Sequence, residues 1–363
     1  MCTTLIRLLT LKESVMKRNT VSAVILASLV APSAVIAAQT FEDNKQVELK
    51  TANAIEINLA HAKIHFIRTD SNQADLSMSQ ILKKGSEEDC LQHFDITQSG
   101  NKITIATEKK DSSWSFFGND CEVERNIVIA LGKGELADLK LNIAHAKFNA
   151  EQIDFITQDW KIAHSNLTIK LVNASNSKLN IAHSLLNVAD FNSVNNEING
   201  AHSQLSIQKY FGSQLDESWQ HGQFTINNAQ LEKLKQNNAH SEIMINQLTA
   251  KFLNADNEHT RFVIQSAQVN NIDVELEHGE VKLDGRFDKV KLETQHAYNQ
   301  VRQSNDQPIL LSADVSHGNL DLYLPEKLSY SYQLNDKQML ESNSASSKIK
   351  VDISHGNSSV FRM

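Results

Sequence analysis

A histidine recurs in this chain at a constant spacing, and no other feature of the sequence constrains the fold as strongly. Eight histidines, beginning with His145, stand nineteen residues apart without a break. Three more follow at intervals of eighteen, twenty-one and thirty-eight residues, and the residue after each of these histidines is small. A fixed period near twenty residues is typical of repeat proteins. With the similar segment headed by His61, the repeat contains His61, His145, His164, His183, His202, His221, His240, His259, His278, His296, His317 and His355.

Apolar residues alternate with polar ones on both sides of each histidine. Around His183, Leu179 and Ile181 precede the histidine at even offsets, whereas Leu186 and Val188 follow it at odd offsets. An alternation of period two indicates strands, and a strand cannot change its inward face without a bend or a bulge. The histidine and the small residue after it therefore predict a corner between two short strands. We expect the histidine to lie at or near the inner edge of that corner.

These features predict an all-β fold, a single-stranded parallel β-helix or β-solenoid with coils of about nineteen residues. Each coil pairs with the next through parallel hydrogen bonds about 4.8 Å apart, so equivalent residues stack in columns. From His145 to His355 there is room for about eleven coils, and the last interval of thirty-eight residues is twice nineteen. Proline is absent between Gln39 and Gln307, which is compatible with continuous strand pairing because proline lacks a donor for the ladder.

The N-terminal segment has the pattern of an export signal. A short basic region precedes an apolar stretch of secretory length, which ends in small residues suited to cleavage. We therefore predict a signal peptide at residues 1–38. Residues 1–15 precede this pattern, so Met16 is a candidate for the true start. An N-terminal membrane anchor is the alternative, although the apolar stretch is shorter than the roughly 20 residues that span a bilayer.

The rest of the chain divides into two regions. Residues 39–134 hold the first histidine segment and a stretch that departs from the period. We interpret them as an N-terminal coil and an irregular capping region that covers the open edge of the first coil. Residues 135–363 hold the regular array and predict a β-solenoid with a C-terminal capping coil. Pro308 and Pro325 bracket a less regular stretch before that last coil.

Two cysteines, Cys90 and Cys121, remain once the signal peptide is removed. In an oxidising compartment two cysteines most simply form one disulfide, and two buried thiols are the alternative. Trp114, Phe116 and Phe117 lie between the cysteines in sequence. We interpret these aromatic residues as part of the core of the cap, with a ligand platform as the alternative.

We interpret the repeated histidines as a structural polar ladder, because a neutral imidazole carries one donor and one acceptor nitrogen. Metal binding is an alternative, since imidazole suits zinc, copper and nickel, but no acidic residue recurs at a fixed offset from the histidines. A third hypothesis is a response to pH, in which protonation of a buried column near pH 5 sets like charges side by side and loosens the coils. We predict no catalytic residue, no metal site and no cofactor.

Three segments resemble a bacterial family of candidate adhesins: VELEHGEVKLDG (274–285), ADVSHGNLDLYLPEKLSYSYQL (313–334) and VDISHGNSSVF (351–361). Coils of that family carry a strand, a turn of a small residue and glycine, and a second strand, often ending in Leu-Pro. The resemblance covers most of residues 50–361 and implies a β-solenoid related in fold to the heads of auto-transporter adhesins. The chain departs from the family where it has His-Ser or His-Ala in place of Ser-Gly or Asn-Gly. Fold-level analogy does not establish a function.

Composition narrows the class of partner. Residues 1–38 carry four basic residues and one acidic residue, so the net charge of the mature chain is about −11 rather than −8. An acidic exported protein is a poor candidate for binding nucleic acid or an anionic membrane surface. We also predict a monomer with no membrane span in the mature chain.

The sequence favours an exported, non-enzymatic β-solenoid, periplasmic or at the cell surface. We expect an adhesin-like or structural protein that binds an unknown envelope protein or glycan through an extended repeat surface. One alternative is a polysaccharide-active β-helix enzyme, and another is a metal-binding or pH-responsive histidine protein. The sequence has no nucleophile elbow, phosphate loop, dinucleotide fingerprint or zinc-protease helix motif.

Overall fold

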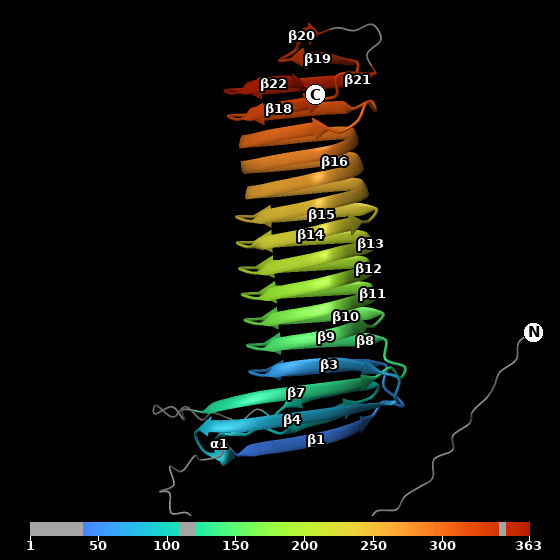
Figure 1. Ribbon diagram of the computed structural model, residues 1–363, viewed down its shortest axis with the longest axis vertical. Coiled ribbons are helices and arrows are strands. Elements are labelled where there is room, and N and C mark those ends of the chain that lie inside the picture. The colour runs from blue at the N-terminus through green and yellow to red at the C-terminus, as the bar shows by residue number, and fades with distance from the viewer. Residues whose placement is uncertain (1–38, 109–120, 341–345) are drawn as a thin grey trace, which may run out of the picture. The chain divides into compact units, whose positions relative to one another are not determined.

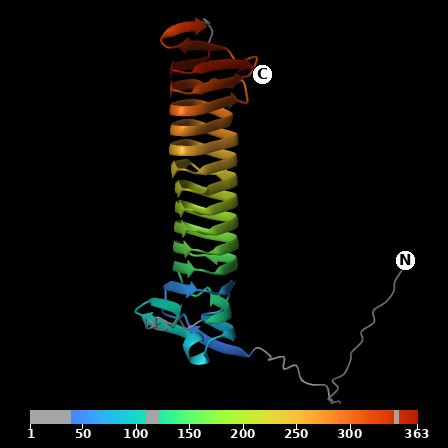
Figure 2. The same ribbon diagram turned by 90° about the vertical axis from the view of Figure 1, so that its left-hand side faces the viewer.

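The computed structural model describes residues 39–108, 121–340 and 346–363, which belong to one compact unit. The predicted signal peptide at residues 1–38 and the aromatic residues Trp114, Phe116 and Phe117 lie outside the described residues. The described chain winds through a stack of coils (Figure 1 and Figure 2). The predicted all-β solenoid is confirmed, with about eleven turns of about nineteen residues and a mixed sheet at its N-terminal end.

Parallel strand pairs connect each coil to the next. Leu167 pairs with Leu186, and Leu186 pairs with Leu205, so the register advances by one period from coil to coil. Each coil supplies a strand before its histidine and another after it, and in β16 several coils follow one another without a break. The strands of the regular stack are β8 (Asp138–Ala144), β9 (Lys147–Asp154), β10 (Thr157–Ala163), β11 (Asn166–Ala182), β12 (Leu185–Ala201), β13 (Gln204–Gln220), β14 (Gln223–Gln230), β15 (Lys233–Ala239), β16 (Glu242–Gln303), β17 (Leu310–Ser316) and β18 (Asn319–Leu324).

The interior of the stack holds the apolar columns that the alternation predicts. Side chains three positions after the histidine point inward, and stacking removes them from water on all sides. Burial of apolar area contributes roughly 25 cal/mol per Å², so neighbouring coils stabilise one another mainly through these columns. The buried members of this column are Phe148, Leu167, Leu186, Leu205, Phe224, Ile243, Phe262, Val281 and Leu320.

The first coil is formed by β2 (Ala54–Ala60) and β3 (Lys63–Thr69), which meet at His61. On one edge these strands pair in parallel with β8 and β9 of the regular stack. On the other edge they pair in parallel with β6 (Lys102–Thr107) and β7 (Glu122–Gly132). The chain therefore leaves the stack after its first coil, covers the open edge of that coil, and returns to continue the array.

Antiparallel strands complete the cap. β4 (Gln73–Lys84) pairs with β7, β1 (Thr40–Glu48) pairs with β4, and β5 (Phe94–Ser99) pairs with β6. Antiparallel pairing ends the parallel stack and occupies backbone groups that an open edge would expose. These strands have no fixed period, in contrast to the coils above them.

A disulfide joins Cys90 to Cys121, as the sequence predicts, with their Cα atoms 5.5 Å apart. Cys90 ends the short helix α1 (Glu87–Cys90), which Ser86 caps by accepting from the backbone N–H of Asp89. Cys121 directly precedes β7. The bond therefore fixes the start of β7 against the helix of the cap.

The interval of thirty-eight residues before His355 is not two coils, which corrects the simple reading of the period. β21 (Ser347–Ser354) and β22 (Asn357–Arg362) pair directly with β17 and β18. The ring of His355 accordingly stacks on that of His317 at a centroid distance of 4.5 Å. One coil, and not two, separates these histidines.

The extra residues form a hairpin of β19 (Tyr330–Leu334) and β20 (Lys337–Leu340). Its turn residues, Asn335 and Asp336, both have positive φ, as a tight two-residue hairpin turn requires. β19 also pairs in parallel with β21. The hairpin thus covers an edge of the last coil, which the period alone could not indicate.

Candidate functional site

The twelve repeated histidines lie in one row along the stack, here called the histidine column. Centroids of adjacent rings are 4.5–5.0 Å apart, and the ring planes are inclined to each other by 0–25°. This distance is the spacing of neighbouring β-strands, so each ring stacks on the ring of the next coil. The role predicted for the column, a structural ladder, stays a prediction.

Each histidine of the column has a left-handed backbone, with φ between 47° and 59°. Among residues other than glycine, histidine, asparagine and aspartate are enriched in this region. The imidazoles point outward: eleven are exposed and His278 is half-buried. The prediction of the inner edge was wrong, because side-chain alternation holds only while the backbone stays extended. The pH hypothesis therefore loses its premise of a buried column.

The small residue after the histidine points inward and closes the corner. Ser184 Oγ donates to the carbonyl of Ala182 at 2.7 Å and accepts from the backbone N–H of Ser165, in the preceding coil, at 3.0 Å. The backbone N–H of His183 donates to the carbonyl of Ala201 in the next coil at 3.0 Å. The corner therefore has partners for its buried backbone groups, which explains why a small residue, often with a hydroxyl, stands there.

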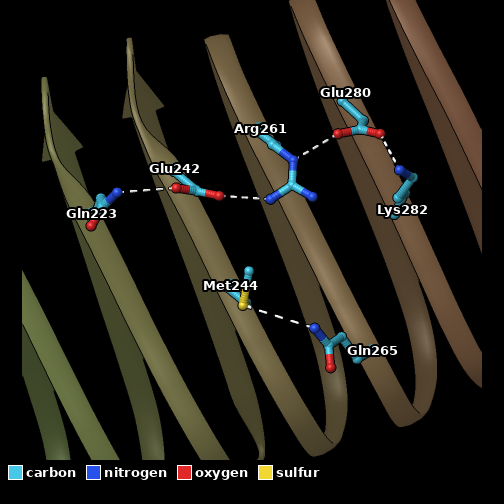
Figure 3. Close-up of polar contacts among 7 residues, drawn as sticks. All are labelled: Gln223, Glu242, Met244, Arg261, Gln265, Glu280 and Lys282. Carbon is cyan, nitrogen blue, oxygen red and sulfur yellow. Dashed lines mark hydrogen bonds and ion pairs between the residues drawn. The ribbon is translucent and has the colours of Figure 1, made fainter.

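A row of polar side chains flanks the column two residues after the histidines (Figure 3). Arg261 donates from Nη1 to Glu242 Oε1 at 2.6 Å and from Nε to Glu280 Oε2 at 2.8 Å. Glu242 also accepts from Gln223 Nε2 at 3.1 Å, and Glu280 pairs with Lys282. Opposite charges therefore alternate from coil to coil, and this part of the surface is close to electrically balanced.

Two grooves follow the histidine column. The first has a volume of 560 Å³ and is lined by the rings from His202 to His259 together with Glu242 and Arg261. The second has a volume of 460 Å³ and lies at the N-terminal end of the column, beside Arg125. The two grooves differ in charge, because Arg261 faces carboxylates in the first and Arg125 has no ion pair among the described residues.

A third groove, of 1290 Å³, lies on the other side of the column. Stacked asparagines line it, and Asn199 Nδ2 donates to Asn180 Oδ1 at 3.3 Å. Its surface therefore repeats methyl groups and amides from coil to coil. Five of the six alanines that line it directly precede histidines of the column: Ala60, Ala144, Ala163, Ala182 and Ala201.

The environment of His61 lowers the pKa of its imidazole. Burial is the largest cause, followed by the charges of His145 and Arg125. Each of these disfavours the protonated ring. Additional positive charge is therefore energetically unfavourable at the N-terminal end of the column.

Sequence reasoning missed a buried polar cluster inside the stack, formed by Glu217, Gln236, Asn238 and Asn257. These residues stand two or four positions before a histidine, where other coils carry large apolar residues. The signal was present, because the inward positions of the alternation become polar in three consecutive coils. The apolar residues of the columns alone do not reveal this cluster.

In residues 39–108, 121–340 and 346–363, no three or more His, Cys, Asp or Glu side chains are grouped so that they could hold a metal ion. Across the same described ranges, no helix has the length and apolar character needed to cross a membrane. The disulfide occupies both Cys90 and Cys121.

Solved structures to which this chain is similar include proteins of Parabacteroides species. A protein of Parabacteroides merdae ATCC 43184, described as a candidate adhesin, is 11% identical, with 89% of this chain and 96% of that chain covered and a TM-score of 0.33. A candidate adhesin of Parabacteroides distasonis ATCC 8503 is 11% identical, with 88% and 98% covered and a TM-score of 0.32. A candidate lipid-binding protein of the same organism is 10% identical, with 89% and 96% covered and a TM-score of 0.30.

The comparison with curated protein sequences finds no match. Among protein families, the model described as Toastrack DUF4097 matches residues 52–237. This match covers half of the chain and extends from the first coil into the regular array.

Proposed function

Because the chain belongs to the toastrack DUF4097 family, we propose that it is an exported, non-enzymatic β-solenoid that binds an envelope protein or a glycan through its extended repeat surface. The family resemblance seen in the sequence is confirmed by this membership. The proposed protein is adhesin-like or structural, acts as a monomer, and works in the periplasm or at the cell surface.

One observation carries the proposal: the same surface chemistry repeats at every coil. The histidine column presents a ring every 4.5–5.0 Å from His61 to His355, and grooves of 560 and 1290 Å³ follow it on its two sides. Repeat solenoids use such long surfaces to contact extended partners. A long partner that contacts several coils gains binding free energy from each of them. This arrangement suits the binding of an extended partner better than catalysis at a single site.

Two features support export. Residues 1–38 carry the predicted signal peptide. The disulfide between Cys90 and Cys121 suits an oxidising compartment, since such bonds rarely persist in the cytosol.

The test is retention of an envelope protein or a glycan by the immobilised mature chain, from envelope extracts and on glycan arrays. In one variant His202, His221 and His240 are changed to Asn, which tolerates the left-handed backbone of the corner. In the control Gln230, Thr249 and Gln268, three exposed residues at equivalent positions of successive coils, are changed to Ser. We expect the histidine variant to lose most of the binding and the control to keep it. No retention by the unaltered chain, or equal loss in both variants, contradicts the proposal.

A further inference from the structure

The groove at the N-terminal end of the histidine column has an unusual charge. It has a volume of 460 Å³, and its lining includes His61, Lys63, Arg125, His145 and Lys147. It lies where the cap meets the first regular coil, since Arg125 belongs to β7 and Lys147 begins β9. The groove therefore combines side chains that are more than 80 residues apart in sequence.

Arg125 is a buried cation that has no anionic partner among the residues described in the structure. Its side chain is only 7% exposed. Its Nε donates to Gln80 Oε1 at 3.0 Å, and its two terminal nitrogens donate to the carbonyls of His61 at 3.4 Å and of Cys90 at 3.5 Å. All three acceptors are neutral, and the two carbonyl contacts are long. A buried charge is costly unless an opposite charge or strong hydrogen bonds compensate it.

The acidic residue in the lining of this groove does not neutralise the positive charge of Arg125. Glu124 is the acid in the lining, and it already pairs with Lys63 and with Lys83. Lys147 is exposed and forms no ion pair with the described part of the chain. Arg125 and Lys147 thus supply two positive charges that no carboxylate of the described residues neutralises.

The cap holds this arrangement in place. Cys90, whose carbonyl accepts from Arg125, is bonded to Cys121, which directly precedes β7. Gln80 of β4 fixes the guanidinium from the other side. The positions of the donors are therefore set before any ligand arrives, which lowers the entropy lost on binding.

We propose that this groove binds a phosphoryl group, with Arg125 and Lys147 as its cationic partners and the column rings beside them as further donors. A guanidinium presents a planar fork of donors that matches phosphate oxygens, and an ammonium adds a compact charge. The groove farther along the column lacks this character, because Arg261 is paired with Glu242 and Glu280. The inference deepens the proposed binding function and rests on it for the biological source of the phosphoryl group.

The test is a calorimetric titration of the mature chain with inorganic phosphate at low ionic strength. Lys147→Gln is expected to weaken binding at least about tenfold, because a charge-assisted hydrogen bond is lost. Lys147→Arg should restore it. Lys233→Gln is the matched control, since Lys233 is also an exposed first residue of a strand without an ion pair in the described ranges. Arg125→Gln, checked for folding by circular dichroism, should abolish binding.

The absence of saturable phosphate binding by the unaltered chain overturns the proposal, as does equal weakening by Lys147→Gln and Lys233→Gln. Vesicles of phosphatidylglycerol and of phosphatidylcholine distinguish the source. Binding to the anionic vesicles that inorganic phosphate competes away supports a headgroup, and phosphate binding without vesicle binding supports a free phosphate. If phosphate binds but envelope extracts and glycan arrays yield no partner, this site stands and the proposed function fails. If a partner is retained but phosphate does not bind, the proposed site is refuted and the proposed function remains.

Discussion

Two stretches of the stack have the same backbone conformation but bury different side chains. In the coils that end at His183 and His202, the positions four residues before the histidine are Leu179 and Ile198. In the next two coils the same positions are Glu217 and Gln236, in unbroken parallel register with the apolar ones. The corner is unchanged across this boundary, with a left-handed histidine followed by a small residue. The corner and the backbone ladder therefore maintain the coil even where the interior is polar.

The polar stretch satisfies its own hydrogen bonds poorly. Asn238 Nδ2 donates to Glu217 Oε2 at 3.1 Å and to Asn257 Oδ1 at 3.0 Å. Glu217 Oε1 and both polar atoms of the Gln236 side chain have no hydrogen bond of normal geometry to the described residues. Burial raises the pKa of Glu217 to about 8, against smaller opposing effects of the Asn238 and Gln236 side chains. Near neutral pH this carboxyl is therefore mostly protonated.

The largest expected effect is a dependence of stability on pH that arises from the polar stretch. The folded chain holds the Glu217 proton more tightly than the unfolded chain, whose carboxyl titrates near 4.5. The stabilisation is complete below about pH 4.5 and is lost as the pH rises through about 8. The loss is on the order of 5 kcal/mol, since each unit of pKa shift corresponds to about 1.4 kcal/mol. Urea unfolding from pH 5 to pH 9 measures it.

Glu217→Gln is the control for this prediction, because the amide has a similar shape and does not titrate. The difference in unfolding free energy between the unaltered chain and this variant should shrink or change sign as the pH rises. If the unfolding free energies of the two proteins change with pH in parallel, the protonation of Glu217 is not the cause of the pH dependence.

A second prediction exchanges the character of the two interiors. Leu179→Gln should destabilise the chain by about 3 kcal/mol, because Leu179 is fully buried and lies in register between Trp160 and Ile198. Gln236→Leu should change stability by less than about 1 kcal/mol at pH 5, because the lost amide makes no hydrogen bond of normal geometry to the described residues. Thermal unfolding by circular dichroism measures both. Equal costs for the two exchanges would mean that the polar interior is as well satisfied as the apolar one.

The boundary between the stretches gives a third prediction. Gly200 occupies a position where the preceding coils have isoleucine, and a Cβ there would lie 2.2 Å from the ring of Trp219 in the next coil. Gly200→Ala should therefore cost about 2 kcal/mol through overpacking. The same change in a Trp219→Leu background should cost much less, because the ring that it contacts is gone. Additive costs in the double variant would exclude this contact as the cause.

The period was enough to predict the coils, the corners and the apolar columns. Residues such as Leu186 and Val188 obey simple alternation, because they lie in extended strands where the side-chain period is two. The direction of the histidine ring could not be predicted in this way, because one left-handed residue breaks the alternation. The sequence also did not indicate that the residues between His317 and His355 form a capping hairpin rather than a coil.

The groove at Arg125 was hidden from the sequence for a different reason. Arg125 and Lys147 line the same groove because β7 and β9 pair with the same strand, β3, on opposite edges. Their placement depends on pairing between strands that are distant in sequence. The cap has no sequence repeat from which the register of that pairing could be predicted. The polar cluster at Glu217 was visible in principle, since its residues stand at inward offsets from known histidines.

The smallest expected effect concerns the feature that both stretches share. His183 lies in the apolar stretch with φ of 49°, and His240 lies in the polar stretch with φ of 52°. A β-branched residue in this conformation costs about 1–2 kcal/mol, so His183→Val and His240→Val should each lower stability by that amount, whatever the coil buries. Glycine adopts the conformation without strain, so His183→Gly and His240→Gly should have little effect in thermal unfolding. If glycine costs as much as valine, the stacked ring itself stabilises the coils, by the roughly 0.5–1.5 kcal/mol typical of an aromatic pair. The histidine column would then be a structural ladder, rather than a surface left available to a partner.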